Sequence, residues 1–202
     1  CDNGFSWACF QVAWWLRNDG EDAAAEALFR RSCERGGRGA CEQLAEMARD
    51  AGRPADVEFA YRKINDIAGC CYFDKLGSLL EQGGRPDEAI AFYGEMCDRG
   101  HRGGCGSLIA LLERQGRSGE IEELRQRLCT QGTADECRTL AGLLRDAGRG
   151  EEAARWEEEA CRLGDPEGCE NVSEQRRERD GPEAAEAFLR QNCSTDNRGG
   201  CR

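Results

Sequence analysis

Few residues in this chain are of the kinds that bind metals or activate a nucleophile. Only one of its 202 residues is a histidine, His101, and no two cysteines stand in a C-x-x-C pair. Zinc sites built from closely spaced histidines and cysteines are therefore excluded. The sequence also lacks G-x-S-x-G, S-x-x-K and H-E-x-x-H motifs and a glycine-rich phosphate loop. We therefore expect no enzyme activity, no metal and no cofactor.

Long apolar segments and basic patches are missing as well. No apolar run approaches the roughly 18 residues that a membrane-spanning helix needs. Lys63 and Lys75 are the only lysines, and the formal net charge is -11. Without a basic stripe the chain is not expected to bind nucleic acid or an anionic membrane surface. Aromatic residues make up 7% of the chain, which favours a stack of short helices over one deep core.

Cysteine, in contrast, is abundant and regularly spaced. Twelve of the 14 cysteines form pairs eight residues apart, and the pairs recur at multiples of 32 residues. Such a strict period indicates a stacked repeat array. The pairs are Cys1 and Cys9, Cys33 and Cys41, Cys97 and Cys105, Cys129 and Cys137, Cys161 and Cys169, and Cys193 and Cys201.

Two helices are predicted in each repeat. Helix A follows the second cysteine of a pair, and its apolar residues at i, i+3 and i+4 predict one buried face, as in Leu44, Met47 and Ala48. The same register places Val12 and Trp15 in the core of the first repeat. After a short glycine turn, helix B carries a similar stripe. We predict an all-α fold, an α/α solenoid (superhelix) of six 32-residue helix-turn-helix repeats in a single domain, 1-202. The expected repeats are 9-40, 41-72, 73-104, 105-136, 137-168 and 169-200.

The paired cysteines are expected to form disulfides. The first thiol of a pair ends helix B, the second begins the next helix A, and the glycine-containing linker folds back between them. Regular pairs at this density indicate an oxidising, extracytoplasmic location: periplasmic, cell-surface or secreted. No signal peptide is visible, so we expect the mature form. Cys1 also suits a lipid anchor, although pairing with Cys9 explains it without one.

The run Ala153 to Cys169 resembles the Sel-one-like repeat (SLR), a relative of the tetratricopeptide repeat (TPR). The resemblance rests on Ala153, Trp156, Ala160, Cys161, Gly164, Asp165, Gly168 and Cys169. The paired cysteines make the chain most similar to the cysteine-rich Helicobacter proteins of that class. The resemblance implies extracytoplasmic protein–protein interaction, and for some members penicillin binding or β-lactam hydrolysis. One departure is a shorter turn between helices A and B.

The third linker breaks the pattern. Asn65 and Phe73 stand where cysteines are expected, and Cys70 and Cys71 are adjacent inside the linker. A vicinal disulfide or local rewiring, an intermolecular bridge, and redox or metal chemistry all remain open for this cysteine pair. We predict that this linker is the least regular joint.

The two ends of the array suggest binding surfaces. Phe10 and Trp14 take positions that are polar or small in the other repeats, so they predict an exposed apolar patch. That patch either contacts a partner or is capped by Phe5 and Trp7. At the other end, Phe188 and Leu189 lie on a final helix B whose unfilled side is expected to face solvent or a partner.

We therefore expect a non-enzymatic scaffold that binds a protein partner, or a structural subunit that assembles head to tail into a filament. Further candidate contacts are the variable helix A positions Glu42, Glu46, Asp74, Arg138 and Glu170. His101 is expected to be an exposed turn residue, and the acidic run 157–159 a solvated helix face.

Overall fold

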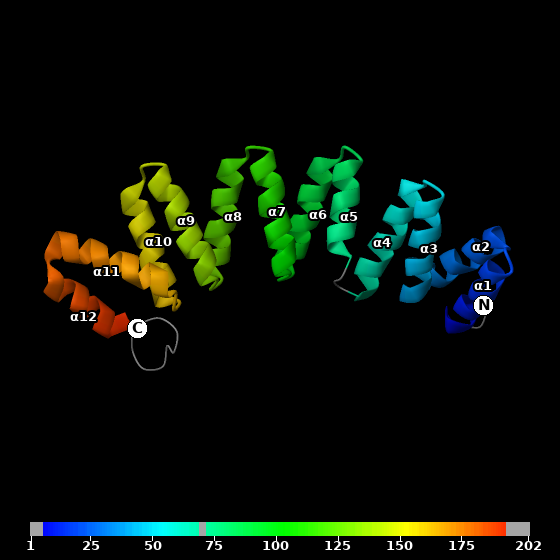
Figure 1. Ribbon diagram of the computed structural model, residues 1–202, viewed down its shortest axis with the longest axis horizontal. Coiled ribbons are helices and arrows are strands. Elements are labelled where there is room, and N and C mark those ends of the chain that lie inside the picture. The colour runs from blue at the N-terminus through cyan, green and yellow to red at the C-terminus, as the bar shows by residue number, and fades with distance from the viewer. Residues whose placement is uncertain (1–5, 69–71, 193–202) are drawn as a thin grey trace. The chain divides into compact units, whose positions relative to one another are not determined.

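The computed structural model describes residues 6–68 and 72–192, and this part of the chain is all-α. Its helices follow one another as helix-turn-helix hairpins, which confirms the predicted α/α repeat fold (Figure 1). The bounds are α1 (Ser6–Asn18), α2 (Asp22–Glu34), α3 (Arg38–Asp50), α4 (Pro54–Ala68), α5 (Phe73–Gln82), α6 (Pro86–Asp98), α7 (Arg102–Arg114), α8 (Ser118–Thr130), α9 (Ala134–Asp146), α10 (Gly150–Arg162), α11 (Pro166–Asp180) and α12 (Pro182–Asn192).

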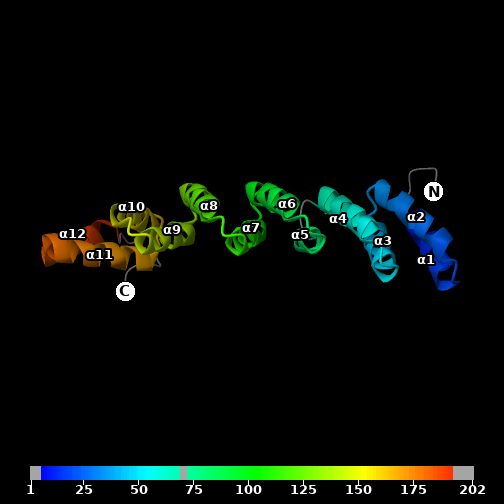
Figure 2. The same ribbon diagram turned by 90° about the horizontal axis from the view of Figure 1, so that it is seen from above.

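The chain forms two compact units, Cys1–Leu111 and Leu112–Arg202. In the first unit, α1–α2, α3–α4 and α5–α6 are hairpins, and α2 packs against α3 as α4 packs against α5 (Figure 2). In the second unit, α9–α10 and α11–α12 are hairpins, with α8 against α9 and α10 against α11. The single-domain assignment and the repeat boundaries stay predictions. No helix in the described ranges is long and apolar enough to cross a membrane.

Disulfides join successive hairpins. Each links the last turn of a helix B to the first turn of the next helix A, with Cα–Cα distances of 4.4 to 4.7 Å. The linker glycine makes the close return possible; Gly36, for example, has φ +87°. The bridges with both cysteines in the described ranges are Cys33–Cys41, Cys97–Cys105, Cys129–Cys137 and Cys161–Cys169. Cys1, Cys70, Cys71, Cys193 and Cys201 lie outside the described residues, so the pairings predicted for them stay predictions.

The buried face of helix A differs by one position from the predicted stripe. Leu44, Ala45 and Ala48 are fully buried, whereas Met47 is only half-buried. The core position missed by the apolar pattern is the one that Ala45 occupies. It holds alanine or glycine in four repeats, as Ala13, Ala45, Gly77 and Ala141, whereas the fourth repeat has Ile109. In the third hairpin that residue is Gly77, where an added Cβ would lie 2.1 Å from the ring of Tyr93.

Helix B buries one further position that the sequence pattern did not single out. Phe29, Tyr61 and Tyr93 occupy it in the first unit, and all three are buried. In the second unit Arg125 and Glu157 occupy it. The polar residues among them pair with helix A of the same hairpin twelve positions earlier. The pairs are Arg49–Tyr61 (2.6 Å), Glu81–Tyr93 (3.2 Å), Glu113–Arg125 (3.7 Å) and Arg145–Glu157.

Glu157 corrects the expectation that residues 157–159 form a solvated face. Its side chain is 1% exposed, because it stands at the core-facing position of α10. Arg145 of α9 pairs with its carboxylate, and the amide of Gln175 in α11 donates to the other oxygen. A buried carboxylate needs such partners to offset its loss of hydration. An acidic triplet thus contains one core residue.

Gly77→Ala should destabilise the protein by about 1–3 kcal/mol, because the new methyl group would overlap the Tyr93 ring. The control is Gly94→Ala in α6 of the same hairpin, where no atom lies within 4 Å of an added Cβ. That change should be neutral or stabilise by up to about 1 kcal/mol, because alanine favours helix. Urea unfolding followed by circular dichroism measures both. Equal effects would contradict the proposed packing.

Removing one bridge with Cys129→Ala and Cys137→Ala should lower the free energy of unfolding by about 2–3 kcal/mol, the loop-closure value for so short a loop. The matched control replaces Glu123 and Gln126, both exposed on α8, with alanine. The measurement is urea unfolding of oxidised protein. An unchanged midpoint in the cysteine variant would show that the hairpin joint is stable without its bridge.

Candidate functional site

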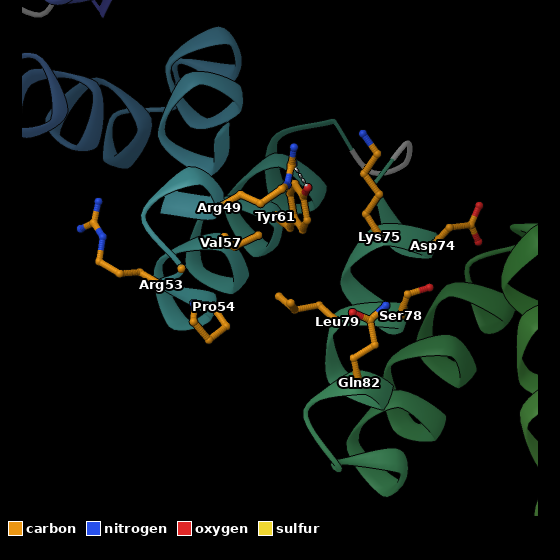
Figure 3. Close-up of a pocket in the computed structure, with 11 residues that line it drawn as sticks. Arg49, Arg53, Pro54, Val57, Tyr61, Asp74, Lys75, Ser78, Leu79 and Gln82 are labelled. Carbon is orange, nitrogen blue, oxygen red and sulfur yellow. Dashed lines mark hydrogen bonds between the residues drawn. The ribbon is translucent and has the colours of Figure 1, made fainter. Parts of the chain in front are cut away.

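A groove of about 590 Å³ lies in the first unit, between the hairpin α3–α4 and helix α5 (Figure 3). One wall comes from the end of α3, the turn and the start of α4. The other wall comes from one face of α5. The lining residues are Arg49, Gly52, Arg53, Pro54, Val57 and Tyr61 on the first wall and Asp74, Lys75, Ser78, Leu79 and Gln82 on the second.

The groove has apolar walls and a polar rim. Val57 and Tyr61 are both 5% exposed, so they form a fixed apolar surface, and Leu79 is half-buried opposite them. Arg49 donates a hydrogen bond of 2.6 Å to the Tyr61 hydroxyl, which holds the guanidinium at the rim. This arrangement offers a site for an apolar side chain beside a fixed positive charge.

Arg53 at the groove is held by the preceding hairpin. It donates to Glu26 of α2 at 2.6 and 2.7 Å and to Asp56 of α4 at 3.0 Å. The hydrogen bond from Arg53 holds the pKa of Glu26 below its usual value, although partial burial opposes this shift. The same joint recurs as Arg85–Glu58 in the first unit and Arg149–Glu122 in the second. Arg53 therefore positions the turn, and its charge is already neutralised.

Two other cations of the groove have no carboxylate partner among the described residues. They are Arg49 and Lys75, whose ammonium lies 4.5 Å from the centre of the Tyr72 ring. The single carboxylate of the lining, Asp74, accepts a hydrogen bond of 3.3 Å from Ser107 of α7. In a chain of net charge -11 this groove is thus locally positive. Its electrostatics suit a ligand that carries a carboxylate.

The irregular third linker adjoins this groove. Helix α4 runs to Ala68 and α5 starts only at Phe73, so the helix ends differ here from those at the disulfide-linked joints. Asn65, at the first cysteine position, is 4% exposed, and its side-chain oxygen accepts from the backbone N–H of Tyr72 at 3.2 Å. A hydrogen bond therefore stands where the other joints carry a disulfide.

Phe73, at the second cysteine position, packs against α7 and the turn before it. Its ring stacks on His101 with centroids 6.3 Å apart, and an added Cβ on Gly103 would lie 2.7 Å from it. His101 is therefore half-buried, which corrects the expectation of an exposed turn residue. The reason is that the large side chain of Phe73 extends to the turn before α7 and covers His101, which the shorter side chain of a cysteine would not reach.

The aromatic residues of the first hairpin separate into two groups. Phe10 is half-buried, with its ring 5.7 Å from that of Phe29, so it is not part of an exposed patch as expected. Trp7 and Trp14 are 71% and 47% exposed. Phe5 lies outside the described residues, so its predicted role as a cap stays a prediction.

Val12 and Trp15 correct the core prediction for the first repeat. They are 42% and 63% exposed. The equivalents of Val12 in later repeats, such as Leu44 and Leu140, are buried, and in the described chain no hairpin precedes α1. The position of Trp15 is not a regular core position, since its equivalent Leu143 is 44% exposed. The opposite face of α1 is the buried one, through Cys9 and Ala13. The apolar pattern alone did not distinguish the two faces of a terminal helix.

At the other end, the expectation of an open face at Phe188 is wrong. Phe188 is 7% exposed and packs with Cys161, Cys169 and Val172, and Leu189 is partly buried against the same cluster. Arg176 covers the Phe188 ring at 4.5 Å and pairs with Glu158 at 2.7 Å. Helix α11 thus covers Phe188 through Val172 and Arg176.

The variable helix A positions differ in what they contact. Asp74 lines the groove, whereas Glu42 accepts from the Tyr72 hydroxyl at 3.3 Å and Glu46 pairs with Arg17 at 3.2 Å. Arg138 pairs with Asp165 and Glu167, and Glu170 is exposed. Sequence reasoning missed Arg49, Tyr61 and Lys75. The available signal was that Lys75 follows the one linker that breaks the cysteine pattern. Within the described residues, no group of three or more His, Cys, Asp or Glu could hold a metal ion.

Comparison with known proteins gave structural neighbours only. Neither the protein-family models nor the curated proteins gave a match to this sequence. Among solved structures, YrrB, "a TPR protein with an unusual peptide-binding site", is 15% identical with a TM-score of 0.40, over 80% of this chain and 88% of YrrB. PilF of Pseudomonas aeruginosa is 14% identical with a TM-score of 0.40, over 95% of this chain and 94% of PilF.

The third neighbour, c5321, is a protective antigen of uropathogenic Escherichia coli strains displaying an SLR fold. It is 19% identical with a TM-score of 0.43, over 95% of this chain and 46% of c5321, so the chain spans less than half of that protein. Likenesses this distant carry no argument about function. The TPR-like assignment rests on the successive hairpins of the chain itself.

The Glu26–Arg53 joint predicts an acid-sensitive stability term. Because the pKa of Glu26 is lowered in the folded protein, its contribution is present above pH 4.5 and is lost as the pH falls through the folded-state pKa. At pH 7, Glu26→Gln should cost about 0.5–1 kcal/mol, and the difference from wild type should shrink towards pH 3. Urea unfolding across this pH range measures it. Exposed Glu123→Gln is the control, and a constant difference for Glu26→Gln would contradict the ion pair.

Proposed function

We propose that this protein is an extracytoplasmic, non-enzymatic scaffold that binds a protein partner in the groove between α3–α4 and α5. The observation that carries the proposal is the juxtaposition of fixed apolar residues, Val57 and Tyr61, with the cations Arg49 and Lys75. Helical repeats present such surfaces along stacked helices. The groove supplies apolar contacts and positive charge. Its described lining shows no nucleophile hydrogen-bonded to a general base.

The partner segment should carry an apolar side chain next to Asp or Glu. The apolar side chain would pack on Val57, Tyr61 and Leu79, and the carboxylate would pair with Lys75 or Arg49. Charge-assisted hydrogen bonds of this kind add affinity, and the local positive field steers an acidic segment towards the groove. The groove thus selects for an acidic, amphipathic peptide.

The disulfides support the proposed location. Four bridges inside repeat joints are typical of proteins that fold in an oxidising compartment such as the periplasm, the cell surface or the extracellular medium. Membership of the cysteine-rich Helicobacter-type SLR subclass is the finer proposal, supported by the cysteine and glycine positions of the sequence. A lipid at Cys1 remains a further proposal.

The groove is tested by selecting peptides from a random phage-displayed library on the oxidised protein. Wild type should enrich peptides with an acidic residue next to an apolar one. Lys75→Glu should weaken the selected peptides about tenfold, by replacing attraction with repulsion. The control is Lys63→Glu, which changes the only other lysine, outside the groove. Fluorescence anisotropy gives the dissociation constants. Equal binding by both variants, or no enrichment, would refute the groove as the site.

Head-to-tail assembly into a filament is the second candidate, and the exposed tryptophans of α1 favour it. The burial of Phe188 removes one of the two surfaces on which it was based. Trp14→Glu should abolish any assembly that uses α1, as measured by light scattering and negative-stain microscopy. β-Lactam hydrolysis, a third candidate, has no nucleophile motif to support it; a chromogenic β-lactam incubated with the same preparation tests it directly.

A further inference from the structure

Helix α1 carries an exposed apolar surface formed by Trp14, Trp15 and Val12 together with Trp7, which also borders a hollow with Gly39 and Ala40 of α3. We call it the tryptophan face. The three indoles are 71%, 47% and 63% exposed, and they are three of the four tryptophans in the chain. None of them lines the groove between α3–α4 and α5. Such a concentration of exposed tryptophan on one helix is typical of an interaction surface.

The repeat register shows what kind of surface this is. Stepping by multiples of 32 residues relates Trp7 to Gly39, Trp14 to Glu46 and Trp15 to Gln175. In these later repeats the equivalent residue meets the preceding hairpin, at one joint for each of the three positions. The contacts are Gly39 with Phe10 (3.4 Å from an added Cβ), Glu46 with Arg17 (3.2 Å), and Gln175 with Glu157. The tryptophan face is therefore the side of helix A that receives another helix pair.

The charges at the repeat joints indicate which charge a helix packed on the tryptophan face would carry. At three later joints an arginine at the start of the receiving hairpin's second helix pairs with a glutamate on the preceding helix B: Arg53 with Glu26, Arg85 with Glu58 and Arg149 with Glu122. The same register position in the first hairpin is Glu21. Glu21 is exposed and makes no ion pair within the described residues. A helix that complements Glu21 would carry a basic residue at the position where these three joints have glutamate.

This inversion disfavours a second copy stacked in the repeat register. The last helix, α12, carries Glu186 at the position of Glu26, so head-to-tail stacking would place Glu186 of one copy opposite Glu21 of the next. Two carboxylates at that spacing repel each other. The apolar contact would then be formed at the cost of an unfavourable charge pair.

We propose that the tryptophan face binds an amphipathic α-helix of a partner protein, one that carries Lys or Arg at the position where α2, α4 and α8 carry glutamate. The apolar side of that helix covers Trp14, Trp15 and Val12, and its basic residue pairs with Glu21. This surface is separate from the groove, so the protein binds through two places on the first unit. A substitution that abolishes binding at one of these two surfaces should leave binding at the other unchanged.

The probe is a stapled helical peptide that copies α2, Asp22–Glu34, because α2 is the helix that docks against α3 in this register. The staple joins positions 23 and 27, which are exposed alanines in the protein, and Cys33 is replaced by alanine. One version keeps Glu26 and the other carries Glu26→Arg. Both are titrated into oxidised, full-length protein with the background change Trp156→Phe, so that tryptophan emission reports the tryptophan face alone.

The Glu26→Arg peptide should bind roughly tenfold more tightly than the Glu26 peptide and shift the emission to shorter wavelength. Glu21→Arg in the protein should reverse this preference, whereas Lys75→Glu in the groove should leave it unchanged. Trp14→Ala combined with Trp15→Ala should abolish binding of both peptides while far-ultraviolet circular dichroism stays the same.

Four outcomes would overturn the proposal. They are equal binding of the two peptides, no binding of either, a preference that Glu21→Arg does not change, and tryptophans that acrylamide fails to quench in the free monomer. Protection in the monomer would mean that the chain covers its own face. Concentration-dependent burial of the tryptophans in the absence of peptide, measured by sedimentation, would assign the face to a second copy.

Discussion

The constraint on which this structure depends is that a two-helix hairpin cannot bury its own apolar face. Each hairpin leaves one side of helix A and one side of helix B uncovered, and only a neighbouring hairpin can cover them. The disulfides fix the helix ends at which neighbours meet, and arginine–glutamate pairs such as Arg53–Glu26 fix the turn at the other end. Packing, covalent links and charge thus act at the same joints.

That constraint explains what the sequence could and could not predict. The 32-residue period, the helix pairs and the cysteine bridges follow from local spacing, so they were readable without coordinates. Burial on a given face depends on whether a neighbour exists. The apolar register of Val12 therefore predicted a core residue, yet no hairpin of the described chain precedes α1 and Val12 is 42% exposed. The prediction for Glu157 was wrong in the opposite direction, since an expected solvent-exposed residue is buried. Its partners Arg145 and Gln175 come from two other helices, which the local sequence does not reveal.

The groove was invisible to sequence reasoning for a related reason. Its walls belong to different repeats, and its character comes from which charges are already paired. Arg53 and Arg49 look equivalent in the sequence, yet Arg53 is held by Glu26 and Asp56 while Arg49 meets only a tyrosine hydroxyl. What the sequence did indicate was the place, since Asn65 and Phe73 mark the joint where the disulfide is replaced.

Charge at the joints also gives the array an order. The Arg–Glu pair recurs at three joints. At the third joint the arginine is kept as Arg117 while Ile90 stands in place of the glutamate, and at the fifth joint Gly181 and Ala154 stand in place of both members. At the joints that carry it, the pair discriminates against a neighbour that lacks the complementary charge. Glu21 is the inverted member of this series. An inverted charge beside an exposed tryptophan surface disfavours helices that carry glutamate at this position and favours a helix with a basic residue there.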